Sequence, residues 1–217
     1  MSLVLSGSTS GSVTLQEPAV AGTTVLDLPA TSGTILTSAS AISASSITTG
    51  TLPKAQLPTG SVLQVVSTAK TDTFSESVAA GAISGDVTGL TAAITPSTAT
   101  NKILVNVTVC ASVPSNPTFI YLYVNGSASP FVGNTAGSRA RVSVSGIWWN
   151  DDTMNSYAFS FLHSPSSTSA QTYSIRLGHA SGLTRTIYVN RSVNDTDSAQ
   201  FNRNASSITA MEIAYEP

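Results

Sequence analysis

The stretch Lys102–Val109, which reads KILVNVTV, decides the fold class of this 217-residue chain. Side chains alternate between the two faces of an extended strand, so every second residue of the stretch lies on the same face. In this register one face carries only aliphatic residues, which are Ile103, Val105, Val107 and Val109. The stretch therefore predicts a strand with one buried face.

Short apolar runs separated by turn residues continue on both sides of this strand. Phe119–Val124 is almost wholly apolar and leads into Asn125-Gly126, the strongest short signal for a β-hairpin. Further strands are expected over residues 62–66, 90–94, 141–145, 157–163, 173–177, 187–190 and 208–215. Roughly eight or nine strands without a convincing amphipathic helix predict an all-β fold, with a jelly-roll-like β-sandwich head over residues 61–217.

The amino-terminal part of the chain has a different pattern. Residues 1–37 contain short β-favouring bursts bounded by Gly, Pro or Ser, namely Leu3–Leu5, Val13–Leu15, Val25–Leu28 and Ile35-Leu36. These bursts are too short and too far apart to close a core within one chain, so they need a partner surface. The simplest partner is the same segment of other copies, wound about a common axis. We expect an extended, β-rich stem or attachment segment here.

Residues 38–60 are rich in Ser and Thr and are punctuated by two prolines and two glycines. Such a composition is typical of a connecting segment. The predicted organisation is therefore a stem over 1–37, a linker over 38–60 and a head over 61–217.

The composition excludes several classes of partner. Charged residues make up 9% of the chain and the formal net charge is -2, so there is no basic patch for nucleic acid or an anionic membrane. No apolar run approaches the 18 or so residues of a membrane span, which argues against membrane insertion. Cys110 is the only cysteine, so neither an intrachain disulfide nor a cysteine metal cluster is possible. The start, Met1–Leu5, lacks the pattern of a signal peptide, so we expect synthesis in a host cytoplasm.

Several phrases of the sequence resemble a family of phage virion structural proteins, the tail fibres found particularly in cyanobacterial and marine phages. The resemblance extends over most of the chain and is carried by the phrases Ser10–Ala19, Gly22–Thr24, Leu28–Thr34, Leu57–Val66, Gly89–Ser97, Lys102–Val105, Tyr188–Ser192 and Ala205–Glu212. None of them marks a catalytic site, so the resemblance indicates a class of protein and not an activity.

This resemblance implies a homotrimer located in the virion. Its amino-terminal segment would join other tail or baseplate proteins, and its head would bind a host-surface polysaccharide or lipopolysaccharide. A structural alternative is a capsid decoration or head-fibre protein, with the amino-terminal arm lying on the capsid lattice. The composition does not distinguish a tail fibre from a protein of the capsid surface.

The most informative local feature for receptor binding is the segment Trp148-Trp149-Asn150-Asp151-Asp152. In an extended segment the two tryptophans point to opposite faces, so one fills the core or a subunit seam and the other reaches the surface. An exposed tryptophan could stack on a sugar ring while its polar neighbours bind hydroxyl groups. The alternative is that both rings pack between strands or subunits.

All six arginines follow residue 138, and their planar guanidinium groups suit bidentate contacts with an acidic polysaccharide. Arg139, Arg141 and Arg185 are the candidates for receptor contacts. The alternative, which we favour, is that the arginines pair with acidic residues of the protein, such as Asp195, Asp197, Glu212 and Glu216.

Catalytic and metal-binding motifs are weak. His163 and His179 are not accompanied by a nucleophile motif such as Gly-x-Ser-x-Gly. The pairs Asp151-Asp152 and Asp195-x-Asp197 could serve a polysaccharide depolymerase, but aspartates are also favoured in turns for their local hydrogen bonds. Asn194–Asp197 lacks the further ligands of an EF-hand. We expect a structural protein that is not an enzyme and has no cofactor and no metal ion.

Overall fold

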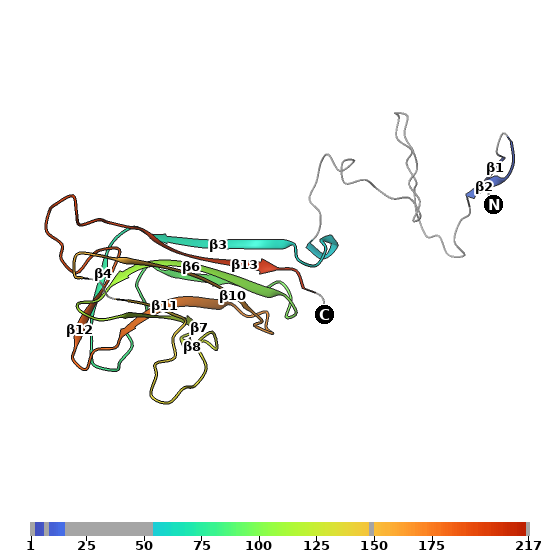
Figure 1. The fold of residues 1–217 in the computed structure, drawn as a ribbon. Helices are drawn as coiled ribbons and strands as arrows, with labels where there is room; N and C mark the ends of the chain where they lie inside the picture. The colour runs from blue at the N-terminus through green and yellow to red at the C-terminus, as the bar shows by residue number, and fades with distance from the viewer. Residues whose placement is uncertain (1–2, 7–8, 16–53, 148–149, 216–217) are drawn as a thin grey trace. The chain divides into compact units, whose positions relative to one another are not determined.

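The structure is a computed structural model that describes residues 3–6, 9–15, 54–147 and 150–215 (Figure 1). The chain divides into two units, Met1–Thr51 and Leu52–Pro217. We call the second unit the head.

In the first unit, strands β1 (Leu3–Ser6) and β2 (Ser12–Leu15) pair in antiparallel fashion. The first two apolar bursts are therefore strands. The other two bursts, at 25–28 and 35–36, lie outside the described residues.

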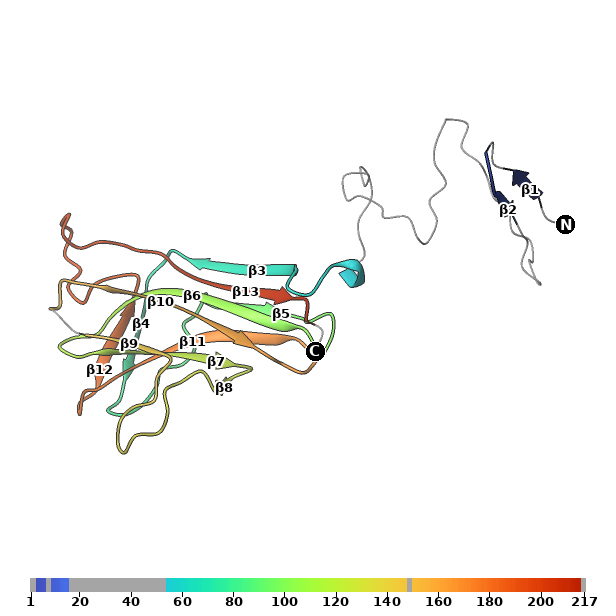
Figure 2. The ribbon, with the colours of Figure 1, turned by 45° about the vertical axis from the view of Figure 1, so that its right-hand side comes forward.

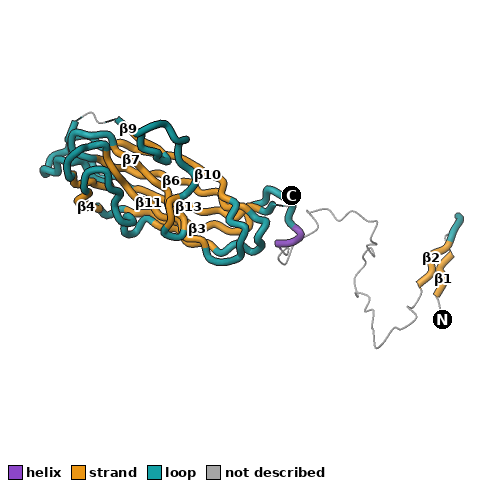
Figure 3. Tube along the Cα trace, turned by 90° about the horizontal axis from the view of Figure 1, so that it is seen from below, coloured by secondary structure: helices purple, strands orange, loops and turns teal. Residues whose placement is uncertain are grey.

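The head is built from strands joined by loops (Figures 1 and 3). A short 3-10 helix, η2 (Lys54–Gln56), precedes them. The strands are β3 (Val62–Lys70), β4 (Phe74–Val78), β5 (Thr91–Ile94), β6 (Lys102–Ser112), β7 (Thr118–Val124), β8 (Ser127–Ala128), β9 (Val144–Gly146), β10 (Asn155–His163), β11 (Gln171–His179), β12 (Arg185–Val189) and β13 (Ser206–Ile213). No α-helix occurs among the described residues, so the all-β prediction is confirmed.

The larger sheet is centred on β6, the strand whose alternation decided the fold class. One edge of β6 pairs with β10, and the other edge pairs with β13 along Lys102–Thr108 and then with β12 at Ala111 and Ser112. β3 continues the sheet beyond β13, and β4 continues it beyond β12. All of these pairings are antiparallel.

The smaller sheet has the order β5-β11-β7-β8, and β9 pairs with β7 as well. A segment before β5 extends it, because the amides of Ser84 and Val87 donate to the carbonyl oxygens of Leu177 and Ile175. The two sheets are thus both antiparallel.

The inner faces of the two sheets enclose one hydrophobic core, which gives the head a β-sandwich-like architecture (Figure 2). The aliphatic face of β6 is buried against Ile120 and Leu122 of β7 and Ile175 and Leu177 of β11. Burial of each such side chain stabilises the fold by roughly 1.5–3 kcal/mol relative to exposure. The strict alternation in β6 therefore reflects one face in this core and one face outside it.

Local signals in the sequence account for some elements better than for others. Asn125 and Gly126 have φ angles of 52° and 76° and connect β7 to β8, which confirms the predicted hairpin. β4 was not predicted, because its sequence FSESV carries three polar residues in five. The strand predicted at 141–145 is observed only as the short β9.

Residues 54–60, which we assigned to the linker, pack with the head. The Gly60 amide donates to the carbonyl oxygen of Ala214, and the Ala214 amide donates to that of Ser61. The chain therefore joins the head beside the last residues of β13. We call this the proximal end of the head and the opposite end the distal end.

Candidate functional site

Three loops meet at the distal end of the head. They follow β6 (113–117), precede β10 (150–154) and precede β13 (190–205). They lie together because Asn155 pairs with Ala111 and Ser207 pairs with Thr108, so the end of β6 adjoins the starts of β10 and β13. Figures 1 and 2 show these connections at the end away from η2. We call them the distal loop cluster.

Asp151 and Asp152 hold the distal loop cluster together. The Asp151 carboxylate accepts a hydrogen bond from the Ser115 amide at 3.1 Å, and its backbone carbonyl accepts one from the Asn194 amide at 2.9 Å. The Asp152 carboxylate accepts a hydrogen bond from the Asn194 side chain. Each of these two adjacent carboxylates therefore links its loop to another loop of the cluster.

A small pocket of about 170 Å³ opens within the cluster. Its walls come from the loop before β10 and the loop before β13, and they include Asp152, Thr153, Gln200, Asn202 and Asn204. The last three side chains are exposed and make no hydrogen bond to any described residue. Each amide supplies both donors and an acceptor, so the pocket offers unused hydrogen-bonding groups to a ligand.

The charges in the last of these loops largely cancel. Asp195 pairs with Arg191, with 3.2 Å between Oδ2 and Nη1, and with Arg203. The hydrogen bond from Arg203 holds the pKa of the Asp195 carboxyl below its ordinary value. The expected pairing of arginines with acidic residues is thus confirmed at Asp195, whose single carboxylate pairs with both guanidinium groups.

The predicted receptor residues are only partly gathered at this end. Asn150, Asp151 and Asp152 belong to the distal loop cluster, whereas Trp148 and Trp149 lie outside the described residues. The arginine candidates are elsewhere in the chain. Arg139 and Arg141 lie in the β8–β9 loop, where they donate to the carbonyl oxygens of Ala136 and Gly133, and Arg185 begins β12 and donates to Ser181.

The three amides of the pocket were not singled out from the sequence. Asn202 and Asn204 alternate with Arg203 in a loop, and neither residue belongs to a motif. Their position follows from the pairing of β13 with β6, which brings the 190–205 loop beside the loop before β10. Only long-range pairing could have identified them.

Both histidines have partners within the fold. His163 Nδ1 lies 2.8 Å from the Tyr173 hydroxyl, and its ring meets Phe131 edge-on. Burial lowers the pKa of His163. His179 is buried, with Nε2 3.0 Å from the Val78 carbonyl oxygen. Both histidines therefore contribute to the packing of the head.

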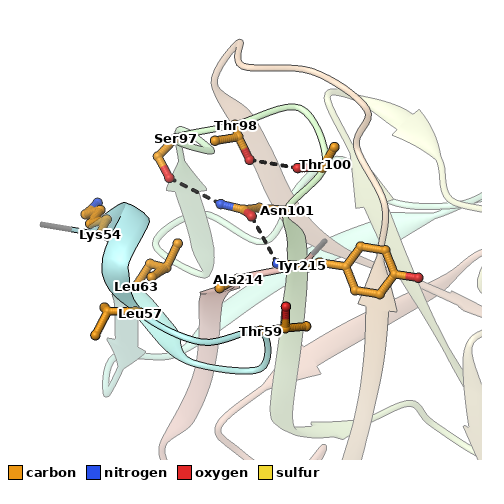
Figure 4. A pocket seen from close by; sticks show the side chains of 10 residues that line it. All are labelled: Lys54, Leu57, Thr59, Leu63, Ser97, Thr98, Thr100, Asn101, Ala214 and Tyr215. Atoms are coloured by element: carbon orange, nitrogen blue, oxygen red, sulfur yellow. Dashed lines mark hydrogen bonds between the residues drawn. The ribbon is translucent and has the colours of Figure 1, made fainter. Parts of the chain in front are cut away.

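A larger pocket of about 320 Å³ lies at the proximal end (Figure 4). It is bordered by Leu57 before β3, by Ser97 and Asn101 between β5 and β6, and by Tyr215 after β13. Asn101 is already engaged, because its side chain bonds to Ser97, to Glu212 and to the Tyr215 amide. This pocket adjoins the segment that connects the head to the rest of the chain, which disfavours it as a receptor site.

The part of the chain that the structure describes contains no group of three or more His, Cys, Asp or Glu side chains placed to hold a metal ion. In the same residues, no helix has the length and apolar character needed to cross a membrane.

Comparison with models of protein families finds no match, and a search of curated proteins finds none either. The function is therefore inferred from the fold of the head and the chemistry of the distal loop cluster.

Proposed function

We propose that this chain is a structural protein of a phage virion, a homotrimeric tail fibre whose head binds a polysaccharide or lipopolysaccharide of the host surface. The observation that carries the proposal is the row of unengaged amides, Gln200, Asn202 and Asn204, in a pocket at the distal end. This end faces away from the point at which the chain joins the head, so it remains open when the amino-terminal segment is attached to a virion.

The chemistry of the pocket matches a carbohydrate. Sugar hydroxyl groups both donate and accept hydrogen bonds, and side-chain amides do the same. The nearby arginines are held by Asp195, so the pocket favours the neutral hydroxyl face of a glycan over its acidic groups. A site this small binds weakly, and three copies on one particle raise the overall avidity by orders of magnitude.

The strand order supports a jelly-roll type for the head. The larger sheet has the order β3-β13-β6-β12-β4 with β10 also paired to β6, and the smaller sheet has the order β5-β11-β7-β8 with β9 also paired to β7. Each sheet thus contains an antiparallel run of four strands, β3-β13-β6-β10 in the larger and β5-β11-β7-β9 in the smaller, and jelly rolls, which recur in viral capsid and lectin domains, pair two antiparallel sheets of this kind. The occurrence of this architecture in viral capsid domains and in lectin domains supports the proposal of a virion protein that binds glycans.

The roles of Asp151 and Asp152 favour binding without cleavage. A glycosidase needs one carboxyl group as an acid and another as a nucleophile or base. Here both carboxylates accept hydrogen bonds that link loops. We therefore place them among the residues that shape the site, and polysaccharide that stays intact after long incubation with the protein is the expected result.

The test is binding of the full chain to a panel of bacterial surface polysaccharides. We expect the double variant Gln200→Ala, Asn202→Ala to lose at least tenfold in apparent affinity for any polysaccharide that the native chain binds. Asn134→Ala, which changes an exposed amide of the β8–β9 loop, is the matched control and should bind normally. Unchanged binding by the double variant would refute the distal site. Antibody labelling confined to the capsid would refute the tail location.

A further inference from the structure

The outer face of the larger sheet is unusual for a surface. It runs across β10, β6, β13 and β3, whose registers align three rows of side chains. The rows are Leu162-Leu104-Met211-Val65, Ser160-Asn106-Thr209-Ser67 and Ala158-Thr108-Ser207-Ala69. None of these twelve residues is ionisable. We call this surface the uncharged face.

Apolar side chains are exposed on the uncharged face. Val65 is 54% exposed and Leu162 is 49% exposed, at opposite ends of the same row. Leu104 and Met211 between them are half-buried. A continuous apolar row therefore crosses the sheet from edge to edge, although the inner faces of the same strands are already buried in the core. The next residue of β6 on this side of the sheet is Lys102, which pairs with Ile213 and lies over the ring of Tyr215, so the uncharged face ends at the Leu104 row.

The outer face of the smaller sheet has the opposite character. Arg176 of β11 pairs with Asp86 at 2.6 Å and lies over the ring of Tyr123, with 3.9 Å from Cζ to the ring centroid. The hydrogen bond to Asp86 raises the pKa of the Arg176 guanidinium. This face thus carries the ion pair expected of a surface in water, whereas the uncharged face lacks any such pair among its twelve residues.

We infer that the uncharged face is the surface through which the heads of sister copies pack in the assembled protein. This inference rests on the proposed homotrimer and names the surface that forms it. Residues around the symmetry axis of a trimer meet the same residues of the sister copies, so a face that surrounds this axis is favoured when it carries no charge. The serine, threonine and asparagine row supplies hydrogen bonds in such a contact, and the apolar row supplies burial.

The connection of the head to the preceding chain points to a sister copy as the occupant. The chain reaches the head directly at β3, an edge strand of this same sheet, and is fixed there by the Gly60–Ala214 hydrogen bond. Copies that assemble through the residues before the head would therefore each be tethered at an edge strand of the sheet that carries the uncharged face.

The size of the face indicates how strongly the heads associate. Four strands about 4.8 Å apart, over the roughly five residues that the three rows span at about 3.4 Å each, cover roughly 330 Å². A stable protein interface buries about 800 Å² on each partner. The face is thus sufficient to orient heads that the amino-terminal segments already hold together, and it is small for holding separate heads.

The accessibility of introduced cysteines in the full chain tests this inference. Ser160→Cys and Ser67→Cys place thiols on the uncharged face, and Thr172→Cys places one on the outer face of the smaller sheet; all three positions are exposed in the single chain. Cys110 is buried and is replaced by Ser in every variant. We expect maleimide to label the first two variants at least tenfold more slowly than Thr172→Cys. Equal labelling rates would overturn the inference.

A charge introduced on the face gives a second readout. Ser160→Arg combined with Ser67→Cys should raise the maleimide labelling rate of residue 67 to that of Thr172→Cys, because the charge separates the heads, and the matched change Thr172→Arg should leave residue 67 slow to label. If the native chain is an oligomer and residue 67 labels as fast as residue 172 without Ser160→Arg, only the assignment of the face is wrong. If the native chain is a monomer with fast labelling at residue 160, both the face and the proposed homotrimer are wrong.

Discussion

Glu212 shows how a single residue can be fully buried and still remain charged. Its carboxylate accepts hydrogen bonds from the Ser97 amide at 2.5 Å and from the Ser97 hydroxyl, the Asn101 amide group and the Gln64 amide group at 2.7 Å each. Burial alone raises the pKa of Glu212, but these hydrogen bonds outweigh it, and the pKa lies below its ordinary value. The carboxylate thereby fixes the β5–β6 loop against β3 and β13.

Replacement of this carboxylate should destabilise the head in a pH-dependent way. We expect Glu212→Gln to lower the free energy of unfolding at pH 7 by about 1–3 kcal/mol, because four donors lose a charged acceptor. The pKa is lower in the folded state, so this stabilisation is full above the ordinary value of 4.5 and is lost as the pH falls through the folded value. Urea unfolding of the native chain and of Glu212→Gln between pH 3 and 7 measures how the difference in their free energies of unfolding changes with pH.

The control for this prediction is Asp197→Asn, which changes an exposed carboxylate that makes no hydrogen bond to the described residues. It should unfold like the native chain at each pH. A constant difference between Glu212→Gln and the native chain across the whole pH range would contradict the assigned role.

At the residue scale the sequence was a poor guide to polar partners. We expected Glu212 to pair with an arginine, and that prediction is wrong, because its partners are Ser97, Asn101 and Gln64. The residues that meet it lie 111 to 148 positions away in the chain. Such contacts depend on which strands become neighbours, and no local pattern records that. Asp195 was predicted better because Arg191 and Arg203 are close to it in sequence.

At the element scale, Asn190 joins four segments of the larger sheet. Asn190 has a φ angle of 63°. Its side-chain amide donates hydrogen bonds to the carbonyl oxygens of Lys70 and Asp72 at the β3–β4 turn. Its side-chain oxygen accepts a hydrogen bond from the Ser206 hydroxyl, which in turn accepts one from the Cys110 amide. These hydrogen bonds fix the place along β6 where its pairing partner changes from β13 to β12.

Loss of this amide should destabilise the corner of the sheet. We expect Asn190→Ala to lower the free energy of unfolding by about 3 kcal/mol, because buried backbone and hydroxyl groups lose their partners. Glycine adopts a positive φ angle without strain but forms none of the side-chain hydrogen bonds. Asn190→Gly should therefore recover only part of the free energy of unfolding that Asn190→Ala loses. Thermal unfolding compares the two with Asn134→Ala. A native-like melting temperature for Asn190→Ala would contradict the proposed stabilising role of the Asn190 hydrogen bonds.

Elements with one buried face were predictable and the others were not. β6, β10 and β11 alternate clearly because one face of each meets the core. β4 lies at the edge of its sheet and pairs only with β12, so few of its residues need to be apolar. The alternation of apolar and polar residues that predicts a strand reflects burial of one face. It is weak in a strand that is held mainly by backbone hydrogen bonds.

At the scale of the whole molecule, the two-sheet head and the separate amino-terminal unit agree with the all-β organisation expected from the sequence. The distal loop cluster and the uncharged face were not foreseen, because both arise from strand register. The proximal end joins the preceding chain. We propose that the uncharged face meets sister heads and that the distal end meets the host surface.

The mass of the full chain in solution tests the central claim, which is that this protein acquires its function as an assembly of identical copies. One chain has a mass of 22.2 kDa. Sedimentation equilibrium should give roughly 67 kDa, the mass of a trimer with closed symmetry. A folded species of 22.2 kDa at every concentration measured would contradict the claim.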